Sequence, residues 1–187
     1  MGVSQIAPLF VVSGASGSGK TTLCRRLADE YGWYYSISFT TRPKRPHEVH
    51  GRDYFFVTRD EFERMVVRGD FLEWAEVYQN LYGTSRLLIE ESLAKGQGVI
   101  LDVDTQGAGN LKALLPQAVT VFIDTPSLAD LEVRLKARAT DAADEIARRV
   151  AHAQKETAKK DQYDSVIVND DLERAVAEFK ALIKQHG

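Results

Sequence analysis

The sequence has little cysteine, little excess charge and no long apolar run. Of its 187 residues only Cys24 is a cysteine, so no disulfide can form within the chain, and a reducing compartment suits it best. Its 24 basic and 27 acidic residues give a net charge of −3, which argues against a generic nucleic-acid-binding protein, since such proteins are usually strongly basic. The longest strongly apolar run, from Leu9 to Val12, is far too short to span a membrane.

Targeting signals are missing as well. Residues 1–8 lack the charged and apolar segments of a secretory signal, and Ile6 stands where the myristoylation pattern requires Ser or Thr. The four histidines lack metal-ligand spacing, and we assign them no role. Hydrophobic residues make up 44% and charged residues 27% of the chain, an ordinary globular composition. We therefore expect one soluble, cytoplasmic domain whose partners include neither nucleic acid nor a membrane.

Short runs rich in β-branched residues predict strands, and amphipathic segments between them predict helices. Several of the runs are apolar throughout, which is typical of strands buried on both faces of a parallel sheet. Because strands and helices alternate, we expect an α/β fold with a five-stranded parallel sheet flanked by helices. The predicted strands are Leu9–Ser13, Tyr35–Phe39, Val99–Val103, Val119–Asp124 and Ser165–Val168.

Two stretches interrupt this alternation. Residues 40–82 hold an Arg- and Pro-rich loop, a strand at 53–57, a helix that begins with the capping pair Thr58 and Glu61, and a further strand at 71–78. They predict a small insertion with its own strands. Residues 134–160 are charged, helical and poor in large apolar residues, so we expect little deep packing there. That pattern is typical of a mobile lid, and also of a solvated helix.

The strongest local motif is Gly14-Ala-Ser-Gly-Ser-Gly-Lys20-Thr21, which matches the phosphate-binding pattern G-x-x-x-x-G-K-[ST]. It follows a predicted strand and opens a predicted helix, as this motif requires. Its glycines let backbone N–H groups converge on phosphate oxygens, and the helix N-terminus adds positive potential. Lys20 would then reach the β- and γ-phosphates of a nucleotide, and the hydroxyl of Thr21 would bind Mg²⁺.

A magnesium site of this kind usually also needs a carboxylate at the end of a buried strand. Asp102 and Asp124 both occupy such positions, and either could instead cap the helix that follows. We favour Asp102, because a second carboxylate, Asp104, follows it and residues i and i+2 of a strand share a face.

A phosphate-binding loop alone does not name a reaction. The Asn-Lys-x-Asp motif of GTPase switches is missing from the sequence, and motor and helicase proteins are generally larger. A small kinase would need a second phosphate site for its acceptor and mobile arginines for the transferred group. The two polar stretches at 40–82 and 134–160 supply both.

Ordered motifs along nearly the whole chain, from about Leu9 to Leu172, closely resemble the guanylate kinase family. They comprise the phosphate-binding loop, Ser36-Ile-Ser-Phe-Thr-Thr-Arg42-Pro-Lys-Arg45-Pro, Glu48, Gly51, Asp53-Tyr54, Glu73-Trp74, Tyr82-Gly83-Thr84, Val99–Ala108 and Asn169–Leu172. The resemblance implies the reaction ATP + GMP = ADP + GDP, with dGMP as a further acceptor and Mg²⁺ as the cofactor that accompanies ATP. It also implies a core of residues 1–38, 84–133 and 161–187, a GMP-binding insertion of residues 39–83 and a lid of residues 134–160.

The resemblance and the residue types assign the two substrates to separate sets of side chains. Carboxylates match the N–H donors of guanine, hydroxyls match its O6, and forked arginines match a phosphate. The predicted GMP-binding residues are Ser38, Arg42, Arg45, Tyr54, Glu73, Tyr82, Thr84 and Asp104. The predicted ATP-binding residues are Gly14, Ala15, Ser16, Gly17, Ser18, Gly19, Lys20, Thr21, Thr22, Arg134, Arg138 and Asn169, with Arg148 and Arg149 closing over the phosphates. The predicted catalytic residues are Lys20, Arg42, Arg138 and Arg149, and the predicted metal-binding residues are Thr21 and, through water, Asp102.

The sequence departs from the family pattern at four positions. His47 and Ala139 stand where glycine is usual, Thr105 stands where a bulky residue often precedes Gln-Gly, and Phe39 replaces a smaller or polar residue. None of these changes removes a chemical group from the reaction. The missing glycines could stiffen the acceptor loop and the lid, which would change the turnover rate without abolishing the activity.

Two other functions stay open on the sequence alone. One is a guanylate-kinase-like domain that binds protein and transfers no phosphate, although the presence of Lys20, Arg42 and Arg45 argues against it. The other is a kinase of a different small phosphate acceptor, against which the guanine-matching residues Glu73 and Asp104 argue. The sequence also leaves open whether the chain forms a homo-oligomer.

Overall fold

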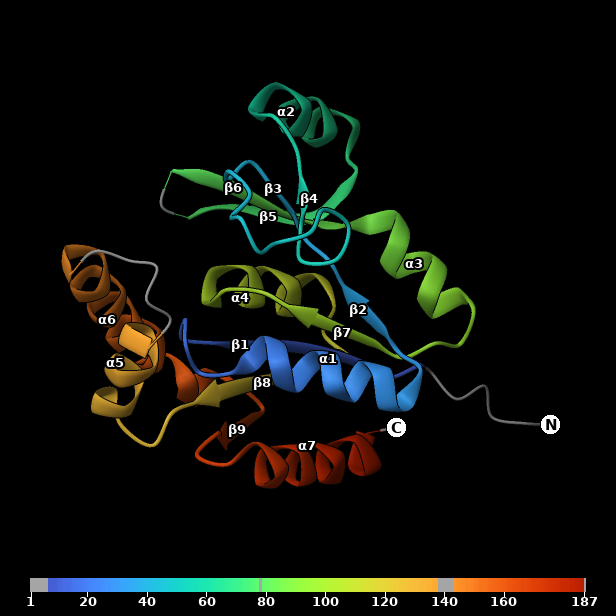
Figure 1. Cartoon of the computed structure of the whole chain (residues 1–187). Helices are drawn as coiled ribbons and strands as arrows, with labels where there is room; N and C mark the ends of the chain where they lie inside the picture. The colour runs from blue at the N-terminus through green and yellow to red at the C-terminus, as the bar shows by residue number, and fades with distance from the viewer. Residues whose placement is uncertain (1–6, 78, 138–142, 187) are drawn as a thin grey trace.

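The computed structural model describes residues 7–77, 79–137 and 143–186, and its strands form two sheets (Figure 1). The larger sheet has five parallel strands in the order β2-β7-β1-β8-β9, which confirms the expected α/β fold. Its strands are β1 (Leu9–Gly14), β2 (Tyr34–Ser36), β7 (Val99–Asp102), β8 (Val119–Asp124) and β9 (Ser165–Val168). The helices between and after them are α1 (Lys20–Tyr31), α3 (Arg86–Ala94), α4 (Thr105–Leu114), α5 (Leu128–Ala137), α6 (Ala143–Thr157), a short 3₁₀ helix (Lys160–Gln162) and α7 (Leu172–His186).

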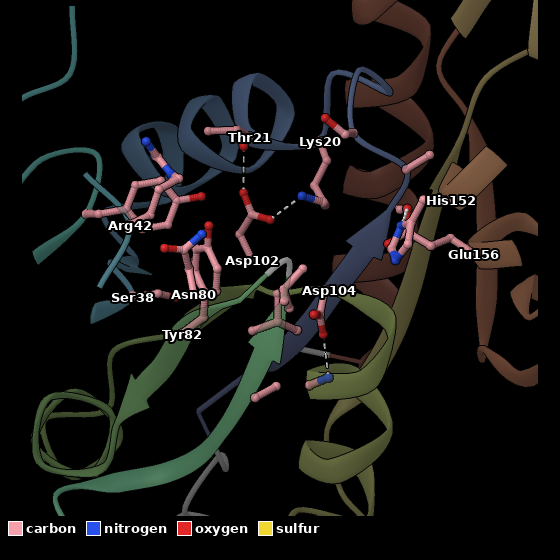
Figure 2. Close-up of a pocket in the computed structure, with 18 of the residues that line it drawn as sticks. Lys20, Thr21, Ser38, Arg42, Asn80, Tyr82, Asp102, Asp104, His152 and Glu156 are labelled. Carbon is pink, nitrogen blue, oxygen red and sulfur yellow. Dashed lines mark hydrogen bonds and ion pairs between the residues drawn. The ribbon is translucent and has the colours of Figure 1, made fainter. Parts of the chain in front are cut away.

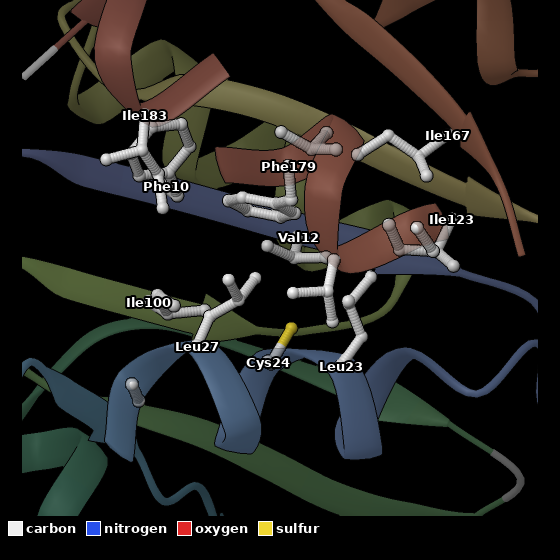
Figure 3. Packing of buried hydrophobic residues seen from close by; sticks show 14 residues of the cluster. Phe10, Val12, Leu23, Cys24, Leu27, Ile100, Ile123, Ile167, Phe179 and Ile183 are labelled. Atoms are coloured by element: carbon white, nitrogen blue, oxygen red, sulfur yellow. The ribbon is translucent and has the colours of Figure 1, made fainter. Parts of the chain in front are cut away.

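Alternate residues of β1 pack into two separate hydrophobic cores, one on each face of the larger sheet. Phe10 and Val12 belong to a core formed with α1 and α7 (Figure 3). Leu9 and Val11 point the other way, into a core formed with α3 and α4. This burial on both faces explains the uninterrupted apolar sequence of β1. Cys24 of α1 packs in the first core, where burial raises the pKa of its thiol well above the usual value.

The smaller sheet forms a separate layer, with α2 (Arg59–Arg68) on the side away from the larger sheet (Figure 1). Its strands, in the order β4-β3-β6-β5, are β3 (Phe39–Thr40), β4 (Phe55–Phe56), β5 (Phe71–Val77) and β6 (Asn80–Ser85). The hydroxyl of Thr58 accepts a hydrogen bond from the N–H of Glu61 at 3.2 Å, which confirms the predicted cap of α2. Phe62 of α2 stacks on Phe71 of β5 with 4.5 Å between ring centroids, and this contact holds the helix on the sheet.

The predicted strand Tyr35–Phe39 is wrong as a single element. β2 ends at Ser36 in the larger sheet, and Phe39 begins β3 in the smaller sheet. The chain crosses between the sheets here because the ring of Phe39 packs 4.6 Å from that of Phe55 and 5.7 Å from that of Phe71. The alternating sequence Tyr-Ser-Ile-Ser-Phe cannot reveal by itself that its two ends pair with different sheets.

The charged stretch around α5 and α6 packs more closely than its composition predicts. Leu131 of α5 and Ala153 of α6 are buried together with Ala15 of the phosphate-binding loop. Ser127 caps α5, since its hydroxyl accepts a hydrogen bond from the N–H of Asp130 at 3.1 Å. In the part of the chain that the structure describes, no helix has both the length and the apolar character needed to cross a membrane.

Candidate active site

The phosphate-binding loop joins β1 to α1 and lines a cavity of about 660 Å³. Two of its glycines leave no space for a Cβ. A Cβ on Gly19 would lie 2.3 Å from Nδ2 of Asn169, and a Cβ on Gly14 would lie 2.2 Å from the carbonyl oxygen of Ile123. The first turn of α1 has neither a side-chain cap nor an acidic residue. Its N–H groups are therefore available to an anion in the cavity.

Asp102, at the end of β7, contacts the two polar side chains with which α1 begins (Figure 2). Its Oδ1 lies 2.7 Å from Nζ of Lys20, and its Oδ2 accepts a hydrogen bond from the hydroxyl of Thr21 at 2.8 Å. Burial disfavours the charged ammonium, but the Asp102 carboxylate outweighs burial and raises the pKa of Lys20 above its usual value. The other candidate, Asp124, pairs with Lys160 at 3.0 Å and is not part of the cavity wall.

Asp104 reaches the cavity by a different route from the one predicted. β7 ends at Asp102, so the two carboxylates do not share a strand face. Asp104 is instead the N-cap of α4, and its Oδ1 accepts a hydrogen bond from the N–H of Gly107 at 2.7 Å. Both carboxylates still line the cavity, because the end of β7 leads directly into the first turn of α4.

Glu48 holds the two arginines of the loop between β3 and β4. Arg42 donates two hydrogen bonds to its carboxylate, at 2.6 and 3.1 Å, and the backbone N–H of Arg45 donates a third at 2.7 Å. Burial acts to raise the pKa of Glu48, but the hydrogen bonds from Arg42 and Arg45 outweigh it and lower the pKa. The Arg42 guanidinium also lies over the ring of Tyr54, 5.3 Å from its centroid. Through these contacts the side chains of Arg42 and Arg45 are held at one wall of the cavity.

Glu73 of β5 presents a buried carboxylate to the same cavity. Its Oε1 accepts a hydrogen bond from the hydroxyl of Thr84, on the neighbouring strand β6, at 2.7 Å. Its Oε2 is buried and has no hydrogen-bond partner among the residues described. Burial raises the pKa of Glu73 to about 7, with the Thr84 hydroxyl opposing the shift and Asp104 adding to it. An acceptor oxygen in this condition is suited to a ligand that brings N–H donors.

The cavity brings most of the predicted site residues together. Those that line it are Gly14, Ala15, Ser16, Gly17, Gly19, Lys20, Thr21, Thr22, Ser38, Arg42, Arg45, Tyr54, Glu73, Tyr82, Asp102, Asp104 and Arg148. Ser18, Thr84, Arg134 and Asn169 are not among the residues that line it. Arg134 donates to the carbonyl of Asn169 at 2.9 Å, and Asn169 in turn donates to the carbonyl of Ser18 at 2.7 Å. Arg138 and Ala139 lie outside the described residues, and the side chain of Arg149 is not described.

Two side chains of α6 that the sequence interpretation missed also line the cavity, namely His152 and Glu156 (Figure 2). The Nδ1 of His152 lies 3.3 Å from Oε2 of Glu156. Burial raises the pKa of Glu156, while His152 and Lys20 oppose the shift. With Arg148 these residues recur at every fourth position, and this spacing could have revealed their common face. A solvated helix has the same spacing, so the pattern alone does not identify a site.

Backbone strain occurs at a position that the sequence does not indicate. Gln79 lies in the turn between β5 and β6 with φ of 65°, and it lines the cavity. It is the one non-glycine residue with a positive φ in the described part of the chain. His47 therefore has an ordinary φ, and the glycine usual at that position is not needed to relieve strain.

Comparisons with known proteins agree with this geometry. The family model described as guanylate kinase matches residues 7–186. The guanylate kinase of Symbiobacterium thermophilum is 51% identical over 94% of this chain and 83% of its own length, and that of Syntrophotalea carbinolica is 49% identical over 96% and 86%.

Solved structures support the same assignment. The crystal structure of guanylate kinase from Anaplasma phagocytophilum superposes with a TM-score of 0.78 at 31% identity, covering 97% of this chain and 86% of that one. A shikimate kinase from Bacteroides thetaiotaomicron, 17% identical with a TM-score of 0.52, shares the fold alone. The match of the family model over nearly the whole chain, together with relatives of about half-identical sequence, shows that this chain belongs to the guanylate kinase family.

Proposed function

We propose that this protein is a guanylate kinase, which transfers the γ-phosphoryl group of ATP to GMP and yields ADP and GDP. One observation carries the proposal: a single cavity contains both a phosphate-binding loop and the Oε2 of Glu73, which is buried and has no partner among the described residues. The loop suits the phosphates of a nucleotide donor, and the free oxygen suits a base with N–H donors. GMP and dGMP share their base and their phosphate, so the same groups would bind both acceptors.

Guanine presents N1–H and N2–H donors beside its O6 acceptor. The Glu73 carboxylate would accept from both donors, with Oε1 kept in place by Thr84. Asp104 lies close enough to influence Glu73 electrostatically and would meet the exocyclic amine. Ser38 would donate its hydroxyl to the rim of the base. Adenine has no N1 proton, so it would leave the Glu73 carboxylate facing a lone pair.

The phosphate of GMP would bind between the arginines and the tyrosines. Arg42 and Arg45, both held by Glu48, bring two forked cations to the cavity wall. The rings of Tyr54 and Tyr82 lie 6.0 Å apart on the same wall, and their hydroxyls would donate to the remaining oxygens. Two arginines beside two tyrosine hydroxyls suit the single phosphate group of a nucleoside monophosphate.

The phosphates of ATP would occupy the loop of residues 14–19 and the first turn of α1. Lys20 would leave Asp102 and contact the β- and γ-phosphates. Arg134 and Asn169 would support the loop from behind through their contacts with each other and with Ser18. Arg148, together with Arg138 and Arg149, would close over the phosphates from the lid of residues 134–160.

Mg²⁺ fits the residues present. The hydroxyl of Thr21 and the carboxylate of Asp102 are hard oxygen donors, and they lie 2.8 Å apart at the edge of the cavity. No group of three or more His, Cys, Asp or Glu side chains in the described residues could hold a metal by itself. This suits an ion bound by one hydroxyl, one carboxylate, water and the phosphates of ATP. When bound, Mg²⁺ neutralises charge on the donor phosphates.

The reaction needs positioning and charge stabilisation more than proton transfer. A phosphate oxygen of GMP attacks the γ-phosphorus, a new P–O bond forms, and the bond from that phosphorus to the bridging oxygen of ADP breaks. The second pKa of a phosphate monoester is about 6, so the nucleophile is already ionised near neutral pH and no general base is required. Lys20 and the lid arginines stabilise the migrating group while Arg42 and Arg45 hold the acceptor. Closure of the lid would exclude water, which otherwise hydrolyses ATP.

Replacement of Glu73 tests this function. Glu73→Gln keeps the shape but exchanges one acceptor oxygen for an NH₂ donor. A hydrogen bond to a charged group contributes roughly 1.5–3 kcal/mol, so kcat/KM for GMP should fall by about 10- to 150-fold while binding of Mg²⁺–ATP stays unchanged. The relative preference for AMP should rise.

The matched control is Glu76→Gln, because Glu76 lies on the same strand but is exposed. It should leave both substrates unaffected. Wild-type protein should first be assayed with ATP against a panel of nucleoside and sugar monophosphates, with the products identified. Failure to form GDP would reject the kinase in favour of a binding domain, and a better acceptor than GMP would reject the assignment of the base site.

A further inference from the structure

Tyr35 contacts the proposed donor site, yet neither the sequence motifs nor the mechanism above gives it a role. It lies on β2, and its hydroxyl donates a hydrogen bond to Oδ2 of Asp102 at 2.9 Å. Its ring packs against the core between the larger sheet and α1, and the Arg25 guanidinium lies over the ring, 5.2 Å from its centroid. The packing of the ring and its contact with this cation restrict where the hydroxyl points.

The three partners of Asp102 differ in what happens to them when a nucleotide binds. Lys20 at Oδ1 and Thr21 at Oδ2 are the groups that the bound phosphates and Mg²⁺ would attract away. Tyr35 has no such second ligand, because it is not part of the cavity wall. Its hydrogen bond is therefore the contact of Asp102 that can persist in both states.

The need for a persistent partner follows from burial. The Asp102 side chain is 8% exposed, so few water molecules can replace the lost contacts of Lys20 and Thr21. A buried carboxylate that loses its hydrogen bonds is strongly disfavoured and free to rotate. A hydroxyl that stays on Oδ2 both stabilises the charge and restricts the rotation of the carboxylate.

We propose that Tyr35 is a positioning residue of the donor site, whose hydroxyl keeps Asp102 aligned towards the Mg²⁺–nucleotide after Lys20 and Thr21 have moved to it. The inference rests on the proposed function, since it takes the ligand to be a nucleoside polyphosphate with its metal. Groups that orient a metal-binding carboxylate typically change metal affinity or activity by about 10- to 100-fold when removed.

Adjacent residues of β2 provide a matched pair of variants. Tyr35→Phe removes the hydroxyl and keeps the ring under Arg25. Tyr34→Phe removes the hydroxyl of the neighbouring residue. The ring of Tyr34 packs against the core on the opposite face of the sheet. The Tyr34 hydroxyl contacts the backbone of Ile37 and not Asp102. The control therefore removes a hydroxyl from the same strand without disturbing the donor site.

Calorimetric titration with ADP, once with Mg²⁺ and once with a chelator, measures the effect without relying on turnover. The ratio of the two affinities should fall by about tenfold in Tyr35→Phe and remain at the wild-type value in Tyr34→Phe. In steady-state assays Tyr35→Phe should raise KM for Mg²⁺–ATP and leave KM for GMP unchanged. If Tyr35 acts through Asp102, adding Tyr35→Phe to Asp102→Asn should lower the ratio no further.

Three results with the variants would overturn the inference: an unchanged ratio in Tyr35→Phe, an equal loss of ADP affinity with and without metal, or a full further loss in the Asp102→Asn background. A wild-type affinity for ADP that Mg²⁺ does not alter would overturn it too. The proposed function is judged separately by whether the wild-type protein forms GDP from ATP and GMP. If the protein forms GDP but Tyr35→Phe has no effect on the affinity ratio, the proposed function stands and the role of Tyr35 is rejected.

Discussion

The hydroxyl of Thr84 donates to Oε1 of Glu73 at 2.7 Å, and the other oxygen of that carboxylate is buried without a partner among the described residues. Burial is the main reason why the pKa of Glu73 rises to about 7. The hydrogen bond from Thr84 lowers this pKa without outweighing burial, and Asp104 raises it further. Protonation of Glu73 therefore competes with ligand binding near neutral pH, since a guanine base that needs both oxygens as acceptors must bind the ionised form.

The first prediction is a pH dependence of GMP binding. The proton and the base compete for Glu73, so binding is strongest above the pKa of about 7 and weakens as the pH falls below it. When only a fraction of the protein is competent, the apparent dissociation constant rises by the reciprocal of that fraction, which amounts to about tenfold between pH 8 and pH 6. KM for GMP should rise in this way as the pH falls, and KM for Mg²⁺–ATP should not.

The control for this profile is Glu73→Gln, which has no carboxyl group to titrate. It should bind GMP poorly at every pH and keep only the shallower slope caused by the phosphate of GMP itself, whose second pKa is about 6. A wild-type profile as shallow as that of the variant would remove Glu73 from the base-binding role.

The second prediction concerns Glu48, which holds Arg42 and Arg45 through three hydrogen bonds. Glu48→Gln leaves one acceptor oxygen and no charge. Arg42 therefore loses its bidentate partner, and its guanidinium is no longer held in one orientation. Because small displacements of a positioning group can cost up to about 100-fold, we expect kcat/KM for GMP to fall by about 10- to 100-fold with KM for Mg²⁺–ATP unchanged. Steady-state kinetics with each substrate varied in turn distinguishes the two effects.

Glu63→Gln serves as the control, since Glu63 pairs with Arg59 on the exposed surface of α2. It should have wild-type kinetics. An equal loss for both substrates in Glu48→Gln would point to general destabilisation rather than to misplacement of the acceptor arginines.

The sequence predicts the larger sheet because its strands carry strong local signals. β1 is buried on both faces and begins with the apolar run Leu9–Val12, and the phosphate-binding motif that follows requires a strand before it and a helix after it. The predicted strand Tyr35–Phe39 fails at a point where local signals are uniform but partners differ. Only the packing of Phe39 against Phe55 and Phe71 assigns its end to the smaller sheet, and those contacts are distant in sequence.

The candidate site divides in a similar way. Lys20, Arg42 and Glu73 could be predicted because each belongs to a motif whose order is visible in the chain. The supporting contacts could not. These contacts depend on side-chain directions that the local sequence does not determine. Examples are the hydrogen bonds of Glu48 with both arginines, the cap that Asp104 forms on α4, and the position of His152 and Glu156 at the cavity.

The third prediction concerns Lys20. Lys20→Ala should retain the fold and lose transfer, because the charge-assisted contact with the β- and γ-phosphates is gone. Loss of a single donor aimed at developing charge lowers kcat by about 10²- to 10³-fold. The variant also leaves Asp102 with the hydroxyls of Thr21 and Tyr35 alone, so its unfolding temperature should drop somewhat. Lys159→Ala, at an exposed position, provides the control. Near-normal turnover in Lys20→Ala would refute the role of Lys20.

The last prediction concerns Gln79, which has φ of 65° between β5 and β6. A residue with a Cβ is disfavoured there by roughly 1–2 kcal/mol, whereas glycine adopts this conformation freely. Glycine is also more flexible in the unfolded chain, which offsets part of the gain, so Gln79→Gly should raise the free energy of unfolding by about 0.5–1 kcal/mol. Gly69 tests the converse, because it has φ of 75° and a Cβ would meet no atom within 4 Å. Gly69→Ala should therefore destabilise the protein through backbone strain alone. Urea unfolding of both variants measures the two effects, and a Gln79→Gly protein less stable than wild type would show that contacts of the glutamine side chain outweigh the strain of its backbone.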